Sequence, residues 1–447
     1  MDRRHIVDDR YGNRPRGKGP ALLLAVLLLS GCLGGVTLPT MRANGTGTAP
    51  HDPAATHLLP QGETPSAVIA DLGARRSVLP PDSTYDRVAR AVLSAAPGVE
   101  AAELGLARLR AEAAARNRWP TITPSLTLDS LAGLAAQLMI DQPLLDNGRR
   151  KAERDRALAE VDAAAVTLAT RQNGRVFDGL SLYLSAEQAR AQGQIAEAAT
   201  ARLTALRDIV LARIAGGLSD RSEDQIIAQT LTEMQATRDA DARLRAQALA
   251  DLAALAQAEV PADLTGLPPL VPPPQDEALS LIAATAQGAR TLAEARITRA
   301  ANLPGLSATT AINKQGATPG LTLGGVRLGP GSPALIAAAD AAPDLVTRQI
   351  DEARHAADRR RTELEGRIAT LRARRAQGDA VLGQTKDNLD LYEEQYRMGR
   401  RSLTDLTAQT AATARLERDQ AALAFEIARA ELELARDVGA LVDGGDL

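Results

Sequence analysis

The feature that most constrains this chain is the absence of proline from two very long stretches. No proline occurs between Pro143 and Pro261, and none follows Pro343. Both stretches are rich in alanine, leucine, arginine, glutamate and glutamine, which favour helices. A continuous helix over residues 149–215 would be about 100 Å long, and helices of this length are usually coiled coils. The chain is therefore predicted to be mainly α, with long helices packed through narrow alanine-rich seams.

The two stretches belong to two similar halves of the chain. Each half contains a predicted helix (residues 84–117 and 276–300), two extended segments, and a long helical stretch broken once by glycine. Pro120 and Pro304 lie 184 residues apart, and the glycines at the breaks, 217 and 399, lie 182 residues apart. Two nearly equal offsets indicate one duplicated unit with a helical hairpin in each copy.

The repeat predicts a domain organisation. A Pro-rich stretch separates the halves, and a Gly-, Pro- and Thr-rich stretch without periodicity precedes them, which is typical of a flexible arm. The predicted segments are a lipoprotein signal peptide (1–31), an acylated N-terminus with a flexible arm (32–83), a first repeat of helix, two strands and long helical hairpin (84–259), a Pro-rich linker (260–275), a second repeat (276–440) and a C-terminal tail (441–447).

The N-terminus carries an export signal. Basic residues precede a short apolar run, residues 21–29, which is far shorter than the roughly 20 residues that cross a bilayer as a helix. The next residues, Leu29-Ser30-Gly31-Cys32, resemble a bacterial lipobox, in which the cysteine is acylated. The alternative is an ordinary signal peptide with an incidental cysteine. Because Cys32 is the only cysteine, no disulfide and no cysteine metal site is expected.

Composition and motif content argue against an enzyme or a nucleic-acid-binding protein. The net charge is -3, without the basic excess that is typical of nucleic-acid binding. The histidines, His5, His51, His57 and His355, have no metal-ligand spacing, and no phosphate-binding loop or nucleophile motif occurs. No catalysis, cofactor, metal or nucleic-acid partner is therefore predicted.

The extended segments have the two-faced pattern of membrane β-barrel strands. In "TITPSLTLDS", Ile122, Leu126 and Leu128 fall on one face of a strand, and threonine and serine fall on the other. "LTLGG" likewise places two leucines on one face. An apolar face outward and a polar face inward is typical of transmembrane barrels. The segments depart from typical barrel strands because Trp119 is the one aromatic residue near a strand end.

The two glycine breaks are predicted to be sharp turns between antiparallel helices. They lie in "ARIAGGLSDRSEDQIIAQ" (212–229) and "EQYRMGRRSLTDLTAQ" (394–409). Glycine suits the left-handed position that ends a helix. Ser402 and Asp405 fit a capping box at the start of the next helix. On this interpretation Asp405 and Glu223 serve in capping and interact favourably with the helix dipole.

The whole plan resembles the TolC family of outer-membrane efflux and secretion channels. "QPLLDNGRRKAERDRALAEVDAA" is similar to the family's strand-to-helix junction, and "YRMGRRSLTDL" is similar to its tyrosine-x-x-glycine-x-arginine tip motif. The resemblance covers about residues 84–440. It implies a homotrimer in which each protomer gives four strands to one shared 12-stranded barrel in the outer membrane. The long helices would form a trimeric α-barrel across the periplasm.

The resemblance also implies a periplasmic gate. Tyr396 and Arg401 of the second repeat would hold the entrance closed by facing the first repeat. Their implied partners there are Ser222 and Glu223. Asp405 would form one ring of three carboxylates, which favours cations in a narrow entrance. The turn residues that would meet an adaptor are Gly216, Gly217, Leu218, Ser219, Gly399, Arg400 and Ser402.

These features predict a passive exit duct in the outer membrane, both lipid-anchored and integral, with a periplasmic extension. Its partners would be a periplasmic adaptor (membrane fusion) protein, an inner-membrane transporter (ABC or proton-driven) and outer-membrane lipid. Type I protein secretion and multidrug efflux both fit the tip motif. The alternatives are a periplasmic lipoprotein adaptor, which carries one hairpin and not two, and a structural coiled-coil protein without a channel.

Overall fold

The computed structural model describes residues 66–96, 98–130, 133–259, 264–272, 275–324 and 329–445. The predicted signal peptide and Cys32 lie outside these residues, so both stay predictions. Over the described residues the protein is mainly helical with one small sheet, as the sequence predicts.

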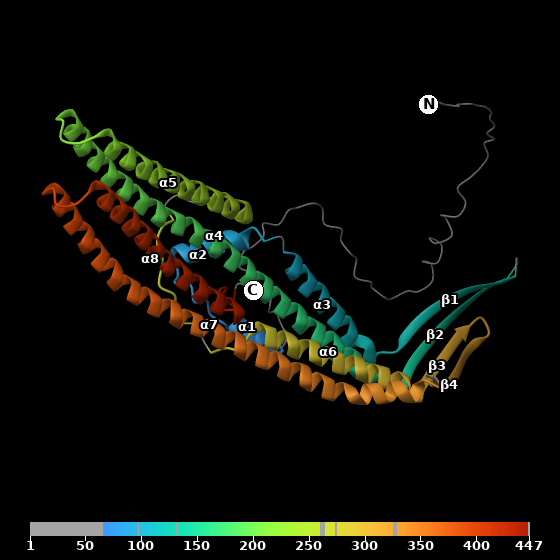
Figure 1. The fold of residues 1–447 in the computed structure, drawn as a ribbon. Helices are drawn as coiled ribbons and strands as arrows, with labels where there is room; N and C mark the ends of the chain where they lie inside the picture. The colour runs from blue at the N-terminus through green and yellow to red at the C-terminus, as the bar shows by residue number, and fades with distance from the viewer. Residues whose placement is uncertain are drawn as a thin grey trace, which may run out of the picture. The chain divides into compact units, whose positions relative to one another are not determined.

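Two repeats follow the first helix, α1 (Ala67–Ala74); each has short helical structure, then a β-hairpin, then a long helical hairpin, and the first repeat has an additional short helix and a 3-10 turn. The first repeat consists of α2 (Thr84–Ser94), α3 (Val99–Ala115), the 3-10 turn η1 (Arg116–Arg118), β1 (Thr121–Ser130), β2 (Gly133–Leu145), α4 (Arg149–Ala215) and α5 (Arg221–Ala256). The second consists of α6 (Leu279–Ala301), β3 (Gly305–Asn313), β4 (Gly316–Gly324), α7 (Ser332–Arg397) and α8 (Leu403–Asp437). Helices α4 and α7 have 67 and 66 residues, which confirms the prediction of two long hairpins, α4–α5 and α7–α8 (Figure 1).

Glycine and alanine let the helices pack closely. A Cβ atom at Gly179 of α4 would lie 2.7 Å from Cγ2 of Val92 on α2, so α2 packs directly on the α4 backbone. In the second repeat a Cβ atom at Gly288 of α6 would lie 2.7 Å from Cγ1 of Val346 on α7. Since real Cβ atoms do not come this close, both positions need glycine, and the predicted narrow seams are present.

The single helix predicted over residues 84–117 is wrong. The structure has two helices there, α2 and α3, followed by η1. The sequence has Pro97 between them, and proline cannot donate the hydrogen bond that continues a helix. Gly98 then takes a left-handed φ of +68° as the first residue outside α3.

The prediction that residues 32–83 form a flexible arm is wrong for the described end of that segment. The described end of the arm contains α1, and Leu72 of that helix is fully buried. Leu441 of the tail is buried in the same core cluster. Both segments are too short for helical or strand periodicity to be recognised, yet they carry enough apolar side chains to complete the core.

The four strands form one antiparallel sheet in the order β1-β2-β3-β4. Each repeat contributes one β-hairpin, and the pairing of β2 with β3 joins the repeats. The register of the strand pairs places the apolar faces of β1 and β4 on the same side of the sheet. On the apolar face Ile122, Leu126, Leu321 and Leu323 are between 60% and 81% exposed. The sheet therefore presents a large uncovered apolar face.

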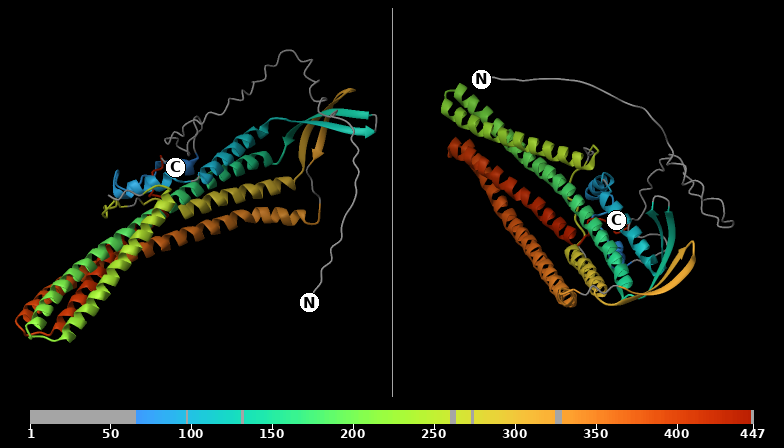
Figure 2. Two further views of the ribbon diagram at one scale, coloured as in Figure 1. Left: turned by 90° about the horizontal axis from the view of Figure 1, so that it is seen from above. Right: turned by 90° about the vertical axis from the view of Figure 1, so that its right-hand side faces the viewer.

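Burial differs strongly between the two long helices. The main core gathers around α4, where Tyr85 of α2 meets Tyr183 edge to face with ring centroids 6.0 Å apart. Buried residues of α4 extend from Ala152 to Val210, whereas α7 buries six side chains along its whole length. Figure 2 shows the hairpins side by side with their turns at one end. No helix in the described ranges combines the length and apolar character that crossing a membrane requires.

Candidate functional site at the hairpin tips

The turns of the two hairpins have the same backbone geometry. Gly217 has a φ of +74° and Gly399 a φ of +72°. In each turn the glycine N–H donates to the carbonyl three residues earlier at 3.0 Å, and the next N–H donates to the carbonyl five residues earlier at 2.8 Å. This pair of bonds is the Schellman motif, whose left-handed residue is usually glycine. The predicted equivalence of the two glycines is confirmed.

A side chain caps the helix that follows each turn. Asp220 Oδ1 accepts a hydrogen bond from the Ser222 N–H at 2.8 Å, and Ser402 Oγ accepts one from the Asp405 N–H at 3.1 Å. The Ser222 hydroxyl, and next its N–H, hold the pKa of Asp220 below its ordinary value. Ser402 is thus the N-cap of α8, as predicted, and Asp220 is the N-cap of α5.

A small apolar cluster joins all four helices beside the turns. Its buried members are Val210 of α4, Ile227 of α5, Leu389 and Tyr396 of α7, and Leu403 and Leu406 of α8. Tyr396 is 4% exposed, and the guanidinium carbon of Arg213 lies 4.8 Å from its ring centroid. Burial raises the pKa of Tyr396, an effect that Arg213 opposes and Glu223 increases. The Tyr396 hydroxyl makes no hydrogen bond of normal geometry within the described chain.

Arg401 contacts residues of its own hairpin. Its Nε donates to Gln395 Oε1 at 3.0 Å, and its guanidinium carbon lies 4.3 Å from the Tyr392 ring centroid. Its Nη1 is 3.8 Å from Asp405 Oδ2. These contacts hold Arg401 along the end of α7 and the start of α8.

The implied gate set is only partly assembled within one chain. Glu223 is close enough to Tyr396 to affect its pKa, but within the described residues Arg401 is not paired with Glu223 or Ser222. The Ser222 hydroxyl donates to Asp220, and Glu223 accepts from the Ser219 hydroxyl. The two first-repeat residues are therefore satisfied within their own turn.

Ion pairs beside the tip cluster were not predicted. Arg202 of α4 pairs with Asp390 at 2.7 Å and with Glu393 at 2.6 Å, both on α7. Arg207 of α4 pairs with Asp224 of α5 at 2.7 Å and lowers its pKa. These pairs tie α4 to its neighbours on both sides. No sequence signal identifies the α4–α7 pairs, because the periodicity of one helix does not specify its register against another.

A buried polar layer crosses the bundle near the middle of α5 and α8. Both terminal nitrogens of Arg418 on α8 donate to Asp241 on α5, with the Nη2–Oδ1 bond at 3.1 Å. Arg418 Nη1 also donates to the Gln192 carbonyl of α4 at 2.8 Å. The side chains of Arg418 and Asp241 are 17% and 4% exposed. This layer fixes the register of α8 against the first hairpin.

The turns themselves are open to solvent. Every predicted turn residue except Ser219 is exposed, and Leu218 is 82% exposed. Met398, which precedes Gly399, is 58% exposed. Each hairpin therefore ends in a rigid turn with one apolar side chain projecting outward.

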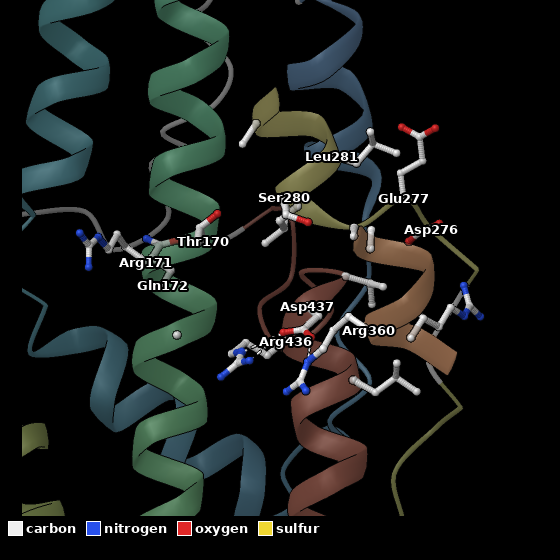
Figure 3. Close-up of a pocket in the computed structure, with 18 of the residues that line it drawn as sticks. Thr170, Arg171, Gln172, Asp276, Glu277, Ser280, Leu281, Arg360, Arg436 and Asp437 are labelled. Carbon is white, nitrogen blue, oxygen red and sulfur yellow. Dashed lines mark hydrogen bonds and ion pairs between the residues drawn. The ribbon is translucent and has the colours of Figure 1, made fainter. Parts of the chain in front are cut away.

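A cavity of about 1070 Å³ lies at the start of α6, between α4, α7 and the end of α8 (Figure 3). Asp437 pairs there with Arg436 at 2.8 Å and with Arg360 at 3.6 Å, and Arg436 covers the Phe177 ring at 4.6 Å. These charged groups are engaged with one another. No cluster of histidine, cysteine, aspartate or glutamate suited to a metal ion occurs in the described part of the chain.

Comparisons with known proteins establish the fold. No protein-family model and no curated protein matches the chain. A membrane protein from Pseudomonas aeruginosa is 18% identical with a TM-score of 0.69, over 84% of this chain and 93% of that one. The outer membrane protein VceC from Vibrio cholerae is 14% identical with a TM-score of 0.66, over 79% and 96%. The outer membrane channel CmeC from Campylobacter jejuni is 13% identical with a TM-score of 0.63, over 92% and 95%. The chain has the fold of TolC-like channels, as the resemblance implied.

Proposed function

We propose that this protein is the outer-membrane exit duct of a tripartite export system, a passive channel without catalysis of its own. The observation that carries the proposal is the two-faced sheet. Four strands leave β1 and β4 as unpaired edges, and an uncovered apolar face of this size is unusual in a water-exposed sheet. Three copies joined edge to edge would form a 12-stranded barrel with the apolar face toward lipid.

The uneven burial of the long helices supports assembly into a trimer. Large apolar side chains of α7, such as Leu345, Val381 and Leu391, are about half exposed in the single chain. Helix α4 is enclosed by helices of both repeats, whereas α7 packs on α6 and α8 and buries far fewer of its side chains. In a closed ring of hairpins each α7 would pack against a neighbouring copy, and the ring would enclose the α-barrel duct.

The tips would form the periplasmic entrance. Within the described residues the buried Tyr396 hydroxyl makes no hydrogen bond of normal geometry, and Arg401 is held by weak, partly solvated contacts. In the closed trimer these groups would face Ser222 and Glu223 of a neighbouring copy. Asp405, 49% exposed at its side chain, would contribute the ring of three carboxylates. Weak links suit a gate that partner docking must open.

The exposed turns would be the docking surface for a periplasmic adaptor protein, which would connect the duct to an ABC or proton-driven inner-membrane transporter. The projecting Leu218 and Met398 offer apolar anchors at the two kinds of turn. The cargo would be a secreted protein or small toxic molecules. A deletion strain separates these alternatives: loss of large extracellular proteins indicates type I secretion, and sensitivity to dyes and antibiotics indicates multidrug efflux. A strain with neither phenotype would contradict the export function.

Acylated Cys32 would be a secondary anchor. If the sheet inserts into the membrane, the lipid is not needed to keep the protein there. The linking segment between Cys32 and α1 leaves room for the lipid and the folded part to reach the membrane independently.

A further inference from the structure

Among the sheet residues whose side chains are described, one carries a charge that the fold does not explain. Among the strand residues whose side chains the structure describes, Asp141 of β2 is the one with a charge. Aspartate is disfavoured in strands, and the other polar residues nearby are mostly threonine and serine. A charge at this position therefore calls for a function.

The register places Asp141 on the polar face of the sheet. It lies opposite Thr121 of β1 and Thr309 of β3, and residues opposite one another share a face. Thr309 Oγ1 in turn lies 3.2 Å from Thr322 Oγ1 of β4. The neighbours of Asp141 along β2, Ile140 and Gln142, belong to the opposite face. Asp141 thus stands in a row of threonine hydroxyls.

No group in the described chain neutralises Asp141. Its Oδ1 atom is buried without a hydrogen-bond partner, and it forms none of the ion pairs found within the described residues. Because no cation of the described chain pairs with it, the carboxylate is free to interact with whatever passes that face. The carboxylate lies four residues before the end of β2, close to the junction with α4.

We infer that Asp141 is a selectivity-determining residue of the duct, where three copies form a carboxylate ring in a threonine collar at the strand-to-helix junction. The inference rests on the proposed trimeric channel, because the polar face becomes a lumen only in a closed barrel. The ring concentrates cations and repels anions. It favours cationic and neutral cargo over strongly anionic cargo, at a level of the duct distinct from the tip residue Asp405.

The test is the reversal potential of the purified full-length protein in planar bilayers under a KCl gradient. At about 0.1 M salt the Debye length is about 10 Å, so a charge ring acts on ions in the lumen. Asp141→Asn removes the charge and keeps the shape, and Asp141→Glu keeps the charge. Thr123→Asn is the matched control, since it changes an exposed side chain on the same face without changing charge. Asp405→Asn tests the tip separately.

The wild-type channel is expected to prefer potassium over chloride, and Asp141→Asn is expected to lower that permeability ratio about threefold or more. Asp141→Glu and Thr123→Asn are expected to retain the wild-type ratio. If Asp141→Asn does not assemble, Asp141→Ser replaces it. A wild-type ratio in the Asn or Ser variant, or loss of selectivity in Asp405→Asn alone, overturns the inference. A wild-type protein that forms no channel at all refutes the proposed function itself.

Discussion

The gate can be tested by loosening the second-repeat turn with Arg401→Ser combined with Tyr396→Phe. Arg401 joins the end of α7 to the start of α8 through Gln395, the Tyr392 ring and Asp405. Serine removes all three contacts. Phenylalanine at position 396 keeps the ring in the tip cluster and removes only the hydroxyl. We expect the double variant to have a higher single-channel conductance than the wild-type protein.

The size of the effect follows from the exposure of Arg401, whose side chain is 39% exposed. A cation–π contact at such a site contributes about 0.5–1 kcal/mol, and an exposed ion pair contributes about 0–1 kcal/mol. Removing both contacts costs the closed tip about 0.5–2 kcal/mol in each protomer. Because about 1.4 kcal/mol is a tenfold change in an equilibrium constant, the open turn becomes about tenfold more populated in each protomer.

The matched control is Arg400→Ser. Arg400 is exposed in the same turn and carries the same charge, and its side chain makes no hydrogen bond or ion pair within the described residues. The single variant Tyr396→Phe separates the two contributions. Within the described residues its hydroxyl has only the weak interaction with Arg213, so its removal should change stability little and should raise conductance only if the hydroxyl reaches another copy.

Planar bilayer recordings of the folded variants measure the single-channel conductance directly. A double variant with wild-type conductance would refute the gate assignment. An equal rise in Arg400→Ser would refute the reasoning as well, because it would trace the effect to net charge at the tip and not to the contacts of Arg401.

Three further predictions concern the interior, the tip caps and the anchor. Asp241→Asn leaves Arg418 buried without its counter-charge and should destabilise the fold by about 3–5 kcal/mol, which a lower melting temperature would show. The double variant Asp241→Leu with Arg418→Met removes both charges and should largely restore the melting temperature. Hydrogen bonds lower the pKa of Asp220 and Asp224 in the folded protein. The two carboxylates therefore stabilise the folded tip at any pH above their pKa in the unfolded chain, and this stabilisation is lost as the pH falls through their lower pKa in the folded protein. Conductance should therefore rise only below about pH 4, and opening between pH 7 and pH 5 would contradict this. Cys32→Ser, exported through a cleavable signal, should still form membrane trimers; loss of all membrane association would make the lipid the true anchor.

The long elements were predictable because the local sequence of each one contains the signal that specifies it. Proline-free sequence predicted α4 with its observed ends at Arg149 and Ala215. Glycine at positions 217 and 399 predicted both turns, since few other residues adopt a left-handed φ at low cost. Alternation in "TITPSLTLDS" predicted the two faces of β1, and the observed register extends them across the sheet.

What the sequence did not predict depends on contacts between distant elements. Asp241 and Arg418 look like ordinary surface charges of two amphipathic helices, and only the packing of α5 against α8 buries them. The same holds for Arg213, which becomes part of the tip through its contact with Tyr396. Helix α1 was missed for a related reason, because one turn or two of apolar sequence has no periodicity to recognise.

The central claim is that three copies close one barrel by joining the free edge of β1 to the free edge of β4 of a neighbouring copy. Disulfide cross-linking tests this most directly, in a Cys32→Ser background that has no other cysteine. Thr123 of β1 is changed to cysteine together with one residue of β4 at a time, from Ala317 to Leu321. Paired edges bring Cα atoms within the about 4.4–6.8 Å that a disulfide spans. Edge pairing predicts that one register gives cross-linked dimers and trimers on a non-reducing gel, with no larger species. Monomer at every register, or a ladder that continues beyond three copies, would contradict the closed trimer.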